Sequence, residues 1–148
     1  MQVNQAMTLK VLAIDPTEML SHAYSIMKKR NVRHLPVVAE DKLLGIITES
    51  DVLRYANFDT GVCRLPNIMV DEIMSKNVIT CSPEATIAEV SLKMVDHRIN
   101  CVPVIKDDHL VGLITATDLL RLLSKIDNQK TPIPFSFELE RHEKSEAS

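Results

Sequence analysis

The sequence predicts an α+β protein built from two copies of one strand–helix–strand–strand–helix unit. The first observation is an internal duplication, in which residues 7–54 align with residues 74–121 without a gap. The second is that each copy combines a stretch of helical apolar period with two short, nearly continuous apolar runs. Such a duplication predicts that the two units bury their apolar faces against each other and that any site occurs twice.

The first copy opens with a short apolar strand, Val11–Ile14, followed by an expected helix start. Asp15 is the expected N-cap, Pro16 the first helical residue and Glu18 the acid three residues after the cap. Ser82-Pro83 opens the second copy by the same logic. In the first copy one helical face is apolar, and it comprises Met19, Leu20, Ala23, Ile26 and Met27.

Each helix is followed by an expected β-hairpin. Its strands span 35–38 and 43–47 in the first copy, and the polar turn spans 39–42. The second hairpin turns at 106–109. Pro36 and Pro103 lack an N–H donor, so each belongs at a strand start or an edge. The continuous apolar character of the strands favours sheets that are covered on both faces.

Short helices are expected to begin near Ser50-Asp51 and near Thr117-Asp118. We expect Asn57–Asp71, with Gly61 and Pro66 as breakers, to connect the two copies. These elements divide the chain into a first repeat with its N-terminal segment over 1–62 and a second repeat with the connector over 63–126. The residues 127–148 are expected to form a C-terminal extension that is partly disordered.

Composition excludes several classes of function. The formal net charge of −3 argues against a dedicated nucleic-acid binder or a binder of anionic membranes. No apolar run reaches the length that spans a membrane, and residues 1–10 show no secretory pattern. The three cysteines have no CxxC spacing, so neither a disulfide framework nor a zinc site is implied. We expect a cytoplasmic protein with reduced thiols.

The most polar identities between the copies are the Thr-x-x-Asp motifs, Thr48…Asp51 and Thr115…Asp118, each after a Gly-apolar-apolar run. One interpretation is a capping box, in which the threonine and the acid satisfy free amides of the helix start. The other is a nucleotide site, because helix N-terminal amides suit a phosphate and a carboxylate suits the vicinal hydroxyls of ribose. Retention of both residues in both copies favours the site.

The chain resembles a tandem pair of CBS (cystathionine β-synthase) domains, the Bateman module. The resemblance is carried by both Gly…Thr…Asp runs, by the hairpin signatures Arg33–Val37 and Asn100–Val104, and by Ile73–Ser75 at the start of the second copy. It covers about residues 7–124, so we expect a stand-alone module. It implies two βαββα repeats packed through their sheets around a pseudo-twofold axis, with two clefts between them.

The resemblance also implies roles for individual residues. Asp51 and Asp118 would hold ribose hydroxyls, while Thr48 and Thr115 would lie near phosphate. Adenine would insert between the hairpin and apolar residues of the first strand, which points to Ile14 and its equivalent Cys81. Basic residues before the Leu-Pro-Val strand would reach phosphate, which points to Arg33 and His34, in a cleft whose aspartate comes from the other repeat.

The second copy has Asn100-Cys101 where the first has Arg33-His34. Because Asn100-Cys101 brings no positive charge, we expect two unequal sites, one for a phosphate chain and one for a nucleoside-like ligand. His34 has an alternative interpretation as a solvated residue at a strand start. Cys101, at the start of a buried strand, is by default an inert core thiol.

The predicted function is a non-catalytic regulatory or sensor module. It would bind an adenine nucleotide (AMP, ADP or ATP) or S-adenosylmethionine and transmit occupancy to a protein partner, with no cofactor and no metal. A homodimer is expected, because outward apolar residues such as Leu119, Leu122 and Leu123 need a cover. The alternative is a structural or protein-interaction module with vestigial nucleotide sites. An enzyme has the least support, because no nucleophile–base pair is evident.

Overall fold

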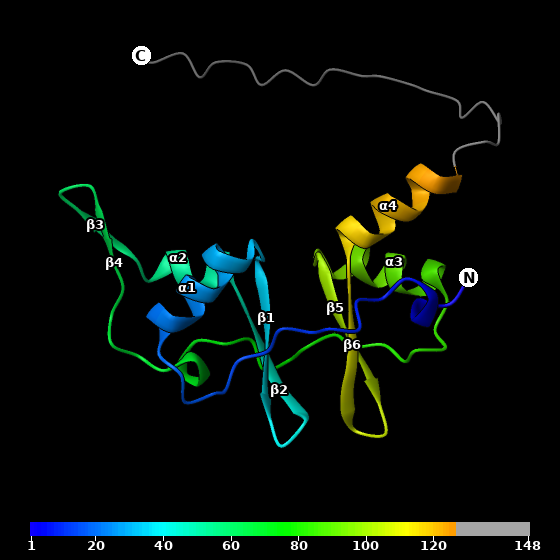
Figure 1. Cartoon of the computed structure of the whole chain (residues 1–148), viewed down its shortest axis with the longest axis horizontal. Helices are drawn as coiled ribbons and strands as arrows, with labels where there is room; N and C mark the ends of the chain where they lie inside the picture. The colour runs from blue at the N-terminus through cyan, green and yellow to red at the C-terminus, as the bar shows by residue number, and fades with distance from the viewer. Residues whose placement is uncertain (127–148) are drawn as a thin grey trace, which may run out of the picture.

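A computed structural model describes residues 1–126 of the chain, and it contains two similar halves (Figure 1). The first half consists of α1 (Leu20–Arg30), β1 (His34–Ala39), β2 (Lys42–Thr48) and α2 (Glu49–Arg54). The second consists of α3 (Ile87–His97), β5 (Cys101–Lys106), β6 (His109–Thr115) and α4 (Ala116–Ile126). The predicted α+β fold of two repeats is confirmed.

Both predicted hairpins are present, and the structure narrows each polar turn to two residues, 40–41 and 107–108. Strand β1 pairs antiparallel with β2, and β5 pairs antiparallel with β6 in the same register. Glu40 and Asp41 have φ values of 51° and 62°, and Asp107 and Asp108 have φ values of 50° and 65°. Left-handed conformations at both turn positions match the twist of a tight hairpin. The polar residues 40–41 and 107–108 thus set the register of each pair of strands.

The predicted first strand is reduced in the structure to one paired residue in each copy. Ile14 forms an isolated parallel bridge with Val37, and Cys81 forms one with Val104. The Ile14 amide donates to the Pro36 carbonyl on the edge of β1 that faces away from β2. Pro36 therefore removes no bond from the β1–β2 ladder, which fits the edge placement that its sequence predicts.

The predicted helix starts at Asp15 and Ser82 are wrong, because the helices begin at Leu20 and Ile87. The Asp15 carboxylate instead accepts hydrogen bonds from the amide and hydroxyl of Thr17, and so closes a turn. The carbonyls of Pro16 and Glu18 accept bonds from the amides of the segment that contains Val70 and Asp71. These carbonyls are then not available to an earlier helical turn.

The segment that precedes each repeat packs on the other repeat. Val3 in η1 (Val3–Gln5) belongs to the core of the second repeat, and Val70 in η2 (Val70–Glu72) belongs to the core of the first. Thr8 bridges Leu113 of β6, and Ser75 bridges Ile46 of β2. The predicted boundary at residues 62 and 63 follows chain order, whereas the packing exchanges these segments between the repeats.

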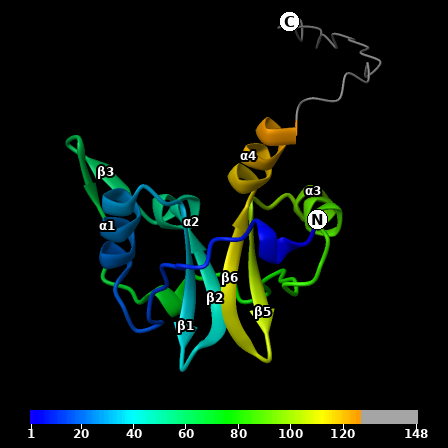
Figure 2. The ribbon, with the colours of Figure 1, turned by 45° about the vertical axis from the view of Figure 1, so that its right-hand side comes forward.

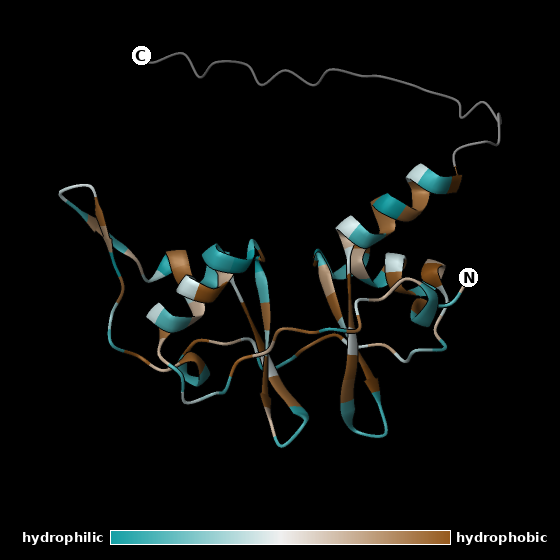
Figure 3. Ribbon diagram, in the orientation of Figure 1, coloured by the Kyte–Doolittle hydropathy of each residue, from teal (hydrophilic) through white to brown (hydrophobic). Residues whose placement is uncertain are grey.

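The two sheets meet through β2 and β6, which lie side by side at the centre of the molecule (Figure 2). Near the hairpin tips, the Leu110 amide donates to the Asp41 carbonyl at 3.2 Å. Side chains on both faces of β1 and β5 are largely buried or partly buried. In β2 and β6, buried residues alternate with partly exposed ones in the half of each strand that leads into the following helix. Hydropathy follows this arrangement, with brown strands inside and teal turns outside (Figure 3).

The connector contains a hairpin that the sequence analysis missed. Strands β3 (Asn57–Asp59) and β4 (Val62–Arg64) pair antiparallel around Thr60 and Gly61, both at positive φ. Gly61 accepts a positive φ readily, but Thr60 is not a usual residue of such a turn, and Asn57 and Asp59 are of types that strands disfavour. The predicted extension over 127–148 lies outside the described residues. Within residues 1–126 no helix has the length and apolarity needed to cross a membrane.

Two glycines mark the places where the exchanged segments approach β2 and β6. A Cβ atom added at Gly45 would lie 2.6 Å from the sulfur of Met74 and 2.7 Å from the Ser75 carbonyl oxygen. At Gly112 the added atom would meet the Met7 side chain alone, with the sulfur at 2.5 Å. Only Gly45 is therefore closed off by backbone, because a methionine side chain can move.

We predict that Gly45→Ala lowers the free energy of unfolding by about 1–3 kcal/mol and that Gly112→Ala lowers it by less. Urea unfolding of the two variants and the unmodified chain measures the difference. Equal midpoints for the two variants would contradict the backbone contact between Ser75 and β2.

Candidate functional site

The Thr-x-x-Asp motif of the first repeat forms a reciprocal capping box at the start of α2. The Thr48 amide donates to Oδ2 of Asp51 at 2.9 Å, and the Asp51 amide donates to Oγ1 of Thr48 at 3.1 Å. Nη2 of Arg54 lies 3.1 Å from the other carboxylate oxygen, Oδ1. Asp51 is only 9% exposed. Its bonds fix the carboxylate but leave lone pairs free, since a carboxylate accepts about four.

The second repeat builds the same arrangement at the start of α4. The Thr115 amide donates to Asp118 at 2.9 Å, and the Asp118 amide donates to the Thr115 hydroxyl at 3.2 Å. Nη1 of Arg121 lies 3.5 Å from the other carboxylate oxygen of Asp118, Oδ1. The capping interpretation is therefore correct for both motifs. It does not exclude a site, because a capped aspartate is held in one orientation.

A cavity of about 300 Å³ opens beside Asp51, and both repeats line it. That volume is at the lower end of the range for small-molecule sites. Asp51, Thr48 and His34 come from the first repeat, and Asn100 and Cys101 come from the second. Its remaining walls are Ile46, Ser50, Ser75, Asn77, Val78, Ile79, Arg98 and Ile99.

The structure brings five of the predicted site residues together in this cavity: His34, Thr48, Asp51, Asn100 and Cys101. Thr115 and Asp118 occupy the equivalent helix start in the second repeat. Arg33 is exposed and is not among the residues that line the cavity beside Asp51.

Ile14 and Cys81 lie in the two cores rather than on the cavity wall. Ile14 is 4% exposed and Cys81 is 6% exposed. The apolar wall is supplied instead by Val78 and Ile79, a few residues before Cys81.

Sequence reasoning missed the segment 75–79 and Arg98. Segment 75–79 reaches the cavity because Ser75 pairs with β2 of the first repeat. The duplication is the sequence signal for this placement of segment 75–79, because two repeats that pack against each other both contribute residues to a cavity between them. Arg98 has no such signal, because its equivalent in the first repeat is the uncharged Asn31.

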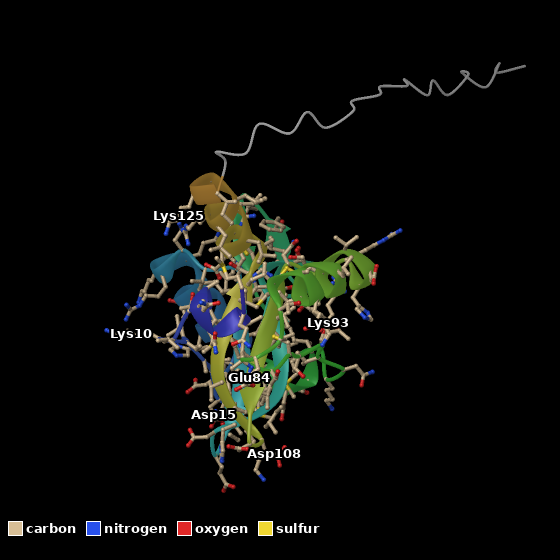
Figure 4. The ribbon with its side chains drawn as sticks, turned by 90° about the vertical axis from the view of Figure 1, so that its right-hand side faces the viewer. Lys10, Asp15, Glu84, Lys93, Asp108 and Lys125 are labelled. Atoms are coloured by element: carbon tan, nitrogen blue, oxygen red, sulfur yellow. The ribbon has the colours of Figure 1, made fainter. Side chains whose placement is uncertain are left out.

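A second cavity, of about 380 Å³, lies towards the hairpin tips and contains none of the predicted site residues. Its polar walls include Lys42, Lys76 and Asp108. Figure 4 shows Asp108 at the tip of the β5–β6 hairpin, at the opposite end of the molecule from Lys125 on α4. We place the candidate site at the Asp51 cavity, where convergent polar groups meet an apolar wall.

The protonation of the cavity residues follows from their burial. Burial lowers the pKa of His34, the positive charge of Arg33 lowers it further, and the Asp51 carboxylate opposes both. Burial raises the pKa of the Cys101 thiol to about 12, and the Asp118 carboxylate adds to the rise. Near pH 7 the cavity therefore presents a largely neutral imidazole and a protonated thiol.

Within residues 1–126 no group of three or more His, Cys, Asp or Glu side chains is placed to hold a metal ion. The polar side chains that line the cavity carry hydroxyls, amides, one carboxylate, one guanidinium, one imidazole and one thiol. Such a set can bind a polar organic molecule by hydrogen bonds, with an apolar wall for a ring.

Comparison with known proteins finds a family match in each half. The profile of the CBS domain matches residues 3–57 and 70–125. The CBS domain-containing protein YhcV of Bacillus subtilis is 31% identical over 117 residues, which are 79% of this chain and 81% of YhcV. A homoserine O-acetyltransferase of Methanococcus vannielii is 35% identical over 124 residues, which are 82% of this chain but 25% of the enzyme.

Among solved structures, the CBS domain pair of protein MJ0100 superimposes with a TM-score of 0.74 and 29% identity. The match covers 86% of this chain and 98% of that domain pair, whose crystals contain 5′-methylthioadenosine and S-adenosyl-L-methionine. The chain thus spans most of YhcV and of the MJ0100 pair, but only about a quarter of the acetyltransferase.

We predict that the imidazole of His34 titrates with a midpoint below its ordinary value of 6.5. Because the unfolded chain then binds the proton more tightly, the contribution of His34 to stability is complete above pH 6.5 and is lost as the pH falls through the folded pKa. Proton NMR, with the signal assigned through His34→Gln, measures the midpoint.

The companion variant Asp51→Asn is expected to lower the His34 midpoint further, since it removes the one charge that favours the imidazolium. A midpoint at or above 6.5 in the unmodified chain would contradict the burial of His34 in this cavity.

Proposed function

The chain belongs to the CBS-domain family, and from that premise we propose that it is a non-catalytic sensor of an adenosyl ligand, bound in the Asp51 cavity. The observation that carries the proposal is the meeting of a fixed, nearly buried carboxylate with polar and apolar walls from both repeats. The MJ0100 pair, which contains two adenosyl compounds, supports the ligand class.

In this proposal Asp51 accepts hydrogen bonds from the two ribose hydroxyls, and the neighbouring hydroxyls of Thr48 and Ser50 lie towards the substituent on the ribose. Val78 and Ile79 provide the apolar surface for the adenine ring. Asp118 and Thr115 are proposed to serve an equivalent cleft, with Arg33 near its phosphate. The two sites are unequal because Asn100 stands where the first repeat has Arg33.

Occupancy would be transmitted by a population shift. A ligand that contacts both repeats stabilises the arrangement of the two halves in which all its contacts are made. The coupling to a protein partner is limited by the difference in ligand affinity between the two arrangements. The three cysteines are free, which suits the reducing cytoplasm where we propose that the protein acts.

An enzymatic function has little support in the cavity. His34 and Cys101 both line it, and such residue types form nucleophile–base pairs in some enzymes. Burial holds the pKa of Cys101 far above neutrality, whereas a catalytic thiol has a lowered pKa. The hydrogen bonds of the described residues include none between these two side chains.

We also propose that the chain forms a homodimer through α4. Leu120 is 64% exposed and Leu123 is 62% exposed, so among the described residues α4 carries exposed apolar side chains. A surface of this kind is typical of an interaction site. It also supports the alternative function, a protein-interaction module with vestigial nucleotide sites.

We predict that Asp51→Ala abolishes binding of S-adenosylmethionine and AMP to this cavity, as measured by calorimetry. In the unmodified chain, a ligand at 100 times its dissociation constant is expected to add about 2.7 kcal/mol to the free energy of unfolding. The variant should lose that gain because the ribose hydroxyls lose their acceptor.

Glu89→Ala is the matched control for the lost helix cap. Glu89 accepts a hydrogen bond from the Thr86 amide at 2.8 Å in the capping box of α3, but it does not line the cavity. It should lower stability and leave binding intact. Absence of binding by the unmodified chain to any adenosyl compound would favour the interaction module instead.

For the dimer, we predict that Leu120→Glu shifts the sedimenting mass from twice 16.6 kDa to 16.6 kDa. Leu9→Glu is the control, because Leu9 is 71% exposed and lies outside α4. A monomeric unmodified chain, or equal dissociation by both substitutions, would contradict an interface on α4.

A further inference from the structure

We propose that the β3–β4 hairpin is an arm that docks on α4 of a second copy of this chain. The resulting homodimer is antiparallel, so that the first repeat of each copy faces the second repeat of the other. The inference rests on the proposed homodimer, and it names the contact that builds the dimer and the orientation of the two copies. The arm comprises residues 55–64, which follow α2 in the chain.

The arm exposes aromatic side chains. Phe58 is 63% exposed and Tyr55 is 49% exposed. These two residues are among only five aromatic residues in the whole chain. A two-stranded hairpin is at best marginally stable by itself in water, and exposed aromatic side chains are typical anchors of protein interfaces. The arm therefore has the character of a contact surface.

The two faces of the arm differ in polarity. Phe58 pairs with Cys63 across the hairpin, while Asp59 and Arg64 belong to the two neighbouring pairs. Because directly paired residues of an antiparallel hairpin share a face, Phe58 and Cys63 project to one side and the two charged residues project to the other. The uncharged side of the arm thus places the Cys63 thiol beside the exposed ring of Phe58.

The second repeat presents an apolar surface that this side of the arm can cover. Leu120, Leu123 and Ile126 of α4 are 64%, 62% and 52% exposed among the described residues. The arm and α4 lie on the same side of the strands, at opposite ends of the molecule (Figures 1 and 2). In a twofold dimer formed through this side with unlike repeats facing, each arm meets the α4 of the other copy, and the two contacts are identical.

The unequal lengths of α2 and α4 fit this arrangement. The two helices begin at equivalent Thr-x-x-Asp motifs, but α2 has six residues and α4 has eleven. Residues 57–59 of β3 are equivalent to residues 124–126, so the first repeat forms the arm where the second repeat continues its helix. With unlike repeats facing, the longer α4 of one copy extends past the short α2 of the other and reaches the arm.

Charge favours the antiparallel orientation over the parallel one. Helix α1 ends with three cations, Lys28–Arg30. The equivalent turn of α3, Val95–His97, contains an acid and no lysine or arginine. A dimer with like repeats facing would bring the two cationic turns towards each other, and juxtaposed like charges are unfavourable. With unlike repeats facing, each cationic turn faces the turn that contains Asp96.

The test uses Cys63 as a reporter, because Cys81 and Cys101, the other two cysteines of the chain, are buried. Ser124→Cys places a second accessible thiol on α4. A short bismaleimide added to this full-length variant should link Cys63 of one copy to position 124 of the other, with a product of twice 16.6 kDa and the linked peptides identified by mass spectrometry. The unmodified chain should give no such product, because its two Cys63 thiols lie at opposite ends of the dimer.

Phe58→Ser measures the energy of the contact. It should raise the dissociation constant of the dimer about tenfold or more, as for the loss of an interface anchor, in analytical ultracentrifugation. Val62→Ser is the matched control, because Val62 is 55% exposed but pairs with Asp59, on the other side of the same arm. It should leave the dissociation constant within about twofold of the unmodified value.

Three results would overturn the arm contact while the homodimer stands. They are a link between the two Cys63 thiols in the unmodified chain, a dimeric Ser124→Cys variant without the link from Cys63 to position 124, and a dissociation constant that Phe58→Ser leaves unchanged. A monomeric unmodified chain would overturn both the proposed homodimer and this inference. Binding of an adenosyl ligand in the Asp51 cavity is tested separately by Asp51→Ala.

Discussion

The packing of the two repeats depends on one constraint. Each repeat pairs with the segment that precedes the other repeat in the chain. Ser75 pairs with Ile46 on β2, and Thr8 pairs with Leu113 on β6. Gly45 allows the first approach, since a side chain there would meet the Ser75 carbonyl. Because Val3 and Val70 are each buried in the core of the opposite repeat, neither half completes its core from its own contiguous residues. The exchange therefore makes one structural unit of two similar halves.

The same exchange explains why the candidate site belongs to both repeats. Segment 75–79 runs from its bridge with β2 towards the second repeat and forms one wall of the cavity. Asp51 faces it from the first repeat, held in place by the Thr48 amide and by Arg54. A ligand in this position would contact both halves, so its affinity would depend on how the two halves are placed relative to each other. A sensor needs this property. The cap of α2 and the proposed ribose contact use different lone pairs of the same carboxylate.

Much of the fold was predictable because local rules and packing agree. The tight turns at 40–41 and 107–108, and the helix starts at Thr48 and Thr115, follow from residue types at fixed spacing. The start of α1 at Leu20 rather than at Asp15 was not predictable, because the carbonyls of Pro16 and Glu18 bond to a segment about fifty residues later. The sequence pointed to Ile14 and Cys81 as the apolar wall of the cavity. The structure places Val78 and Ile79 there instead, because Ser75 pairs with β2 of the other repeat. Arg98 was not predictable as a residue of the cavity wall, because its equivalent in the first repeat is the uncharged Asn31.

The central claim is that one ligand contacts both repeats at the Asp51 cavity. The most direct measurement is a titration of the isotope-labelled chain with AMP, followed by the backbone amide signals of 48–51 and 98–101. Both groups of signals are expected to shift together and to saturate with a single dissociation constant. Shifts confined to one repeat, or two groups that saturate at different concentrations, would contradict it.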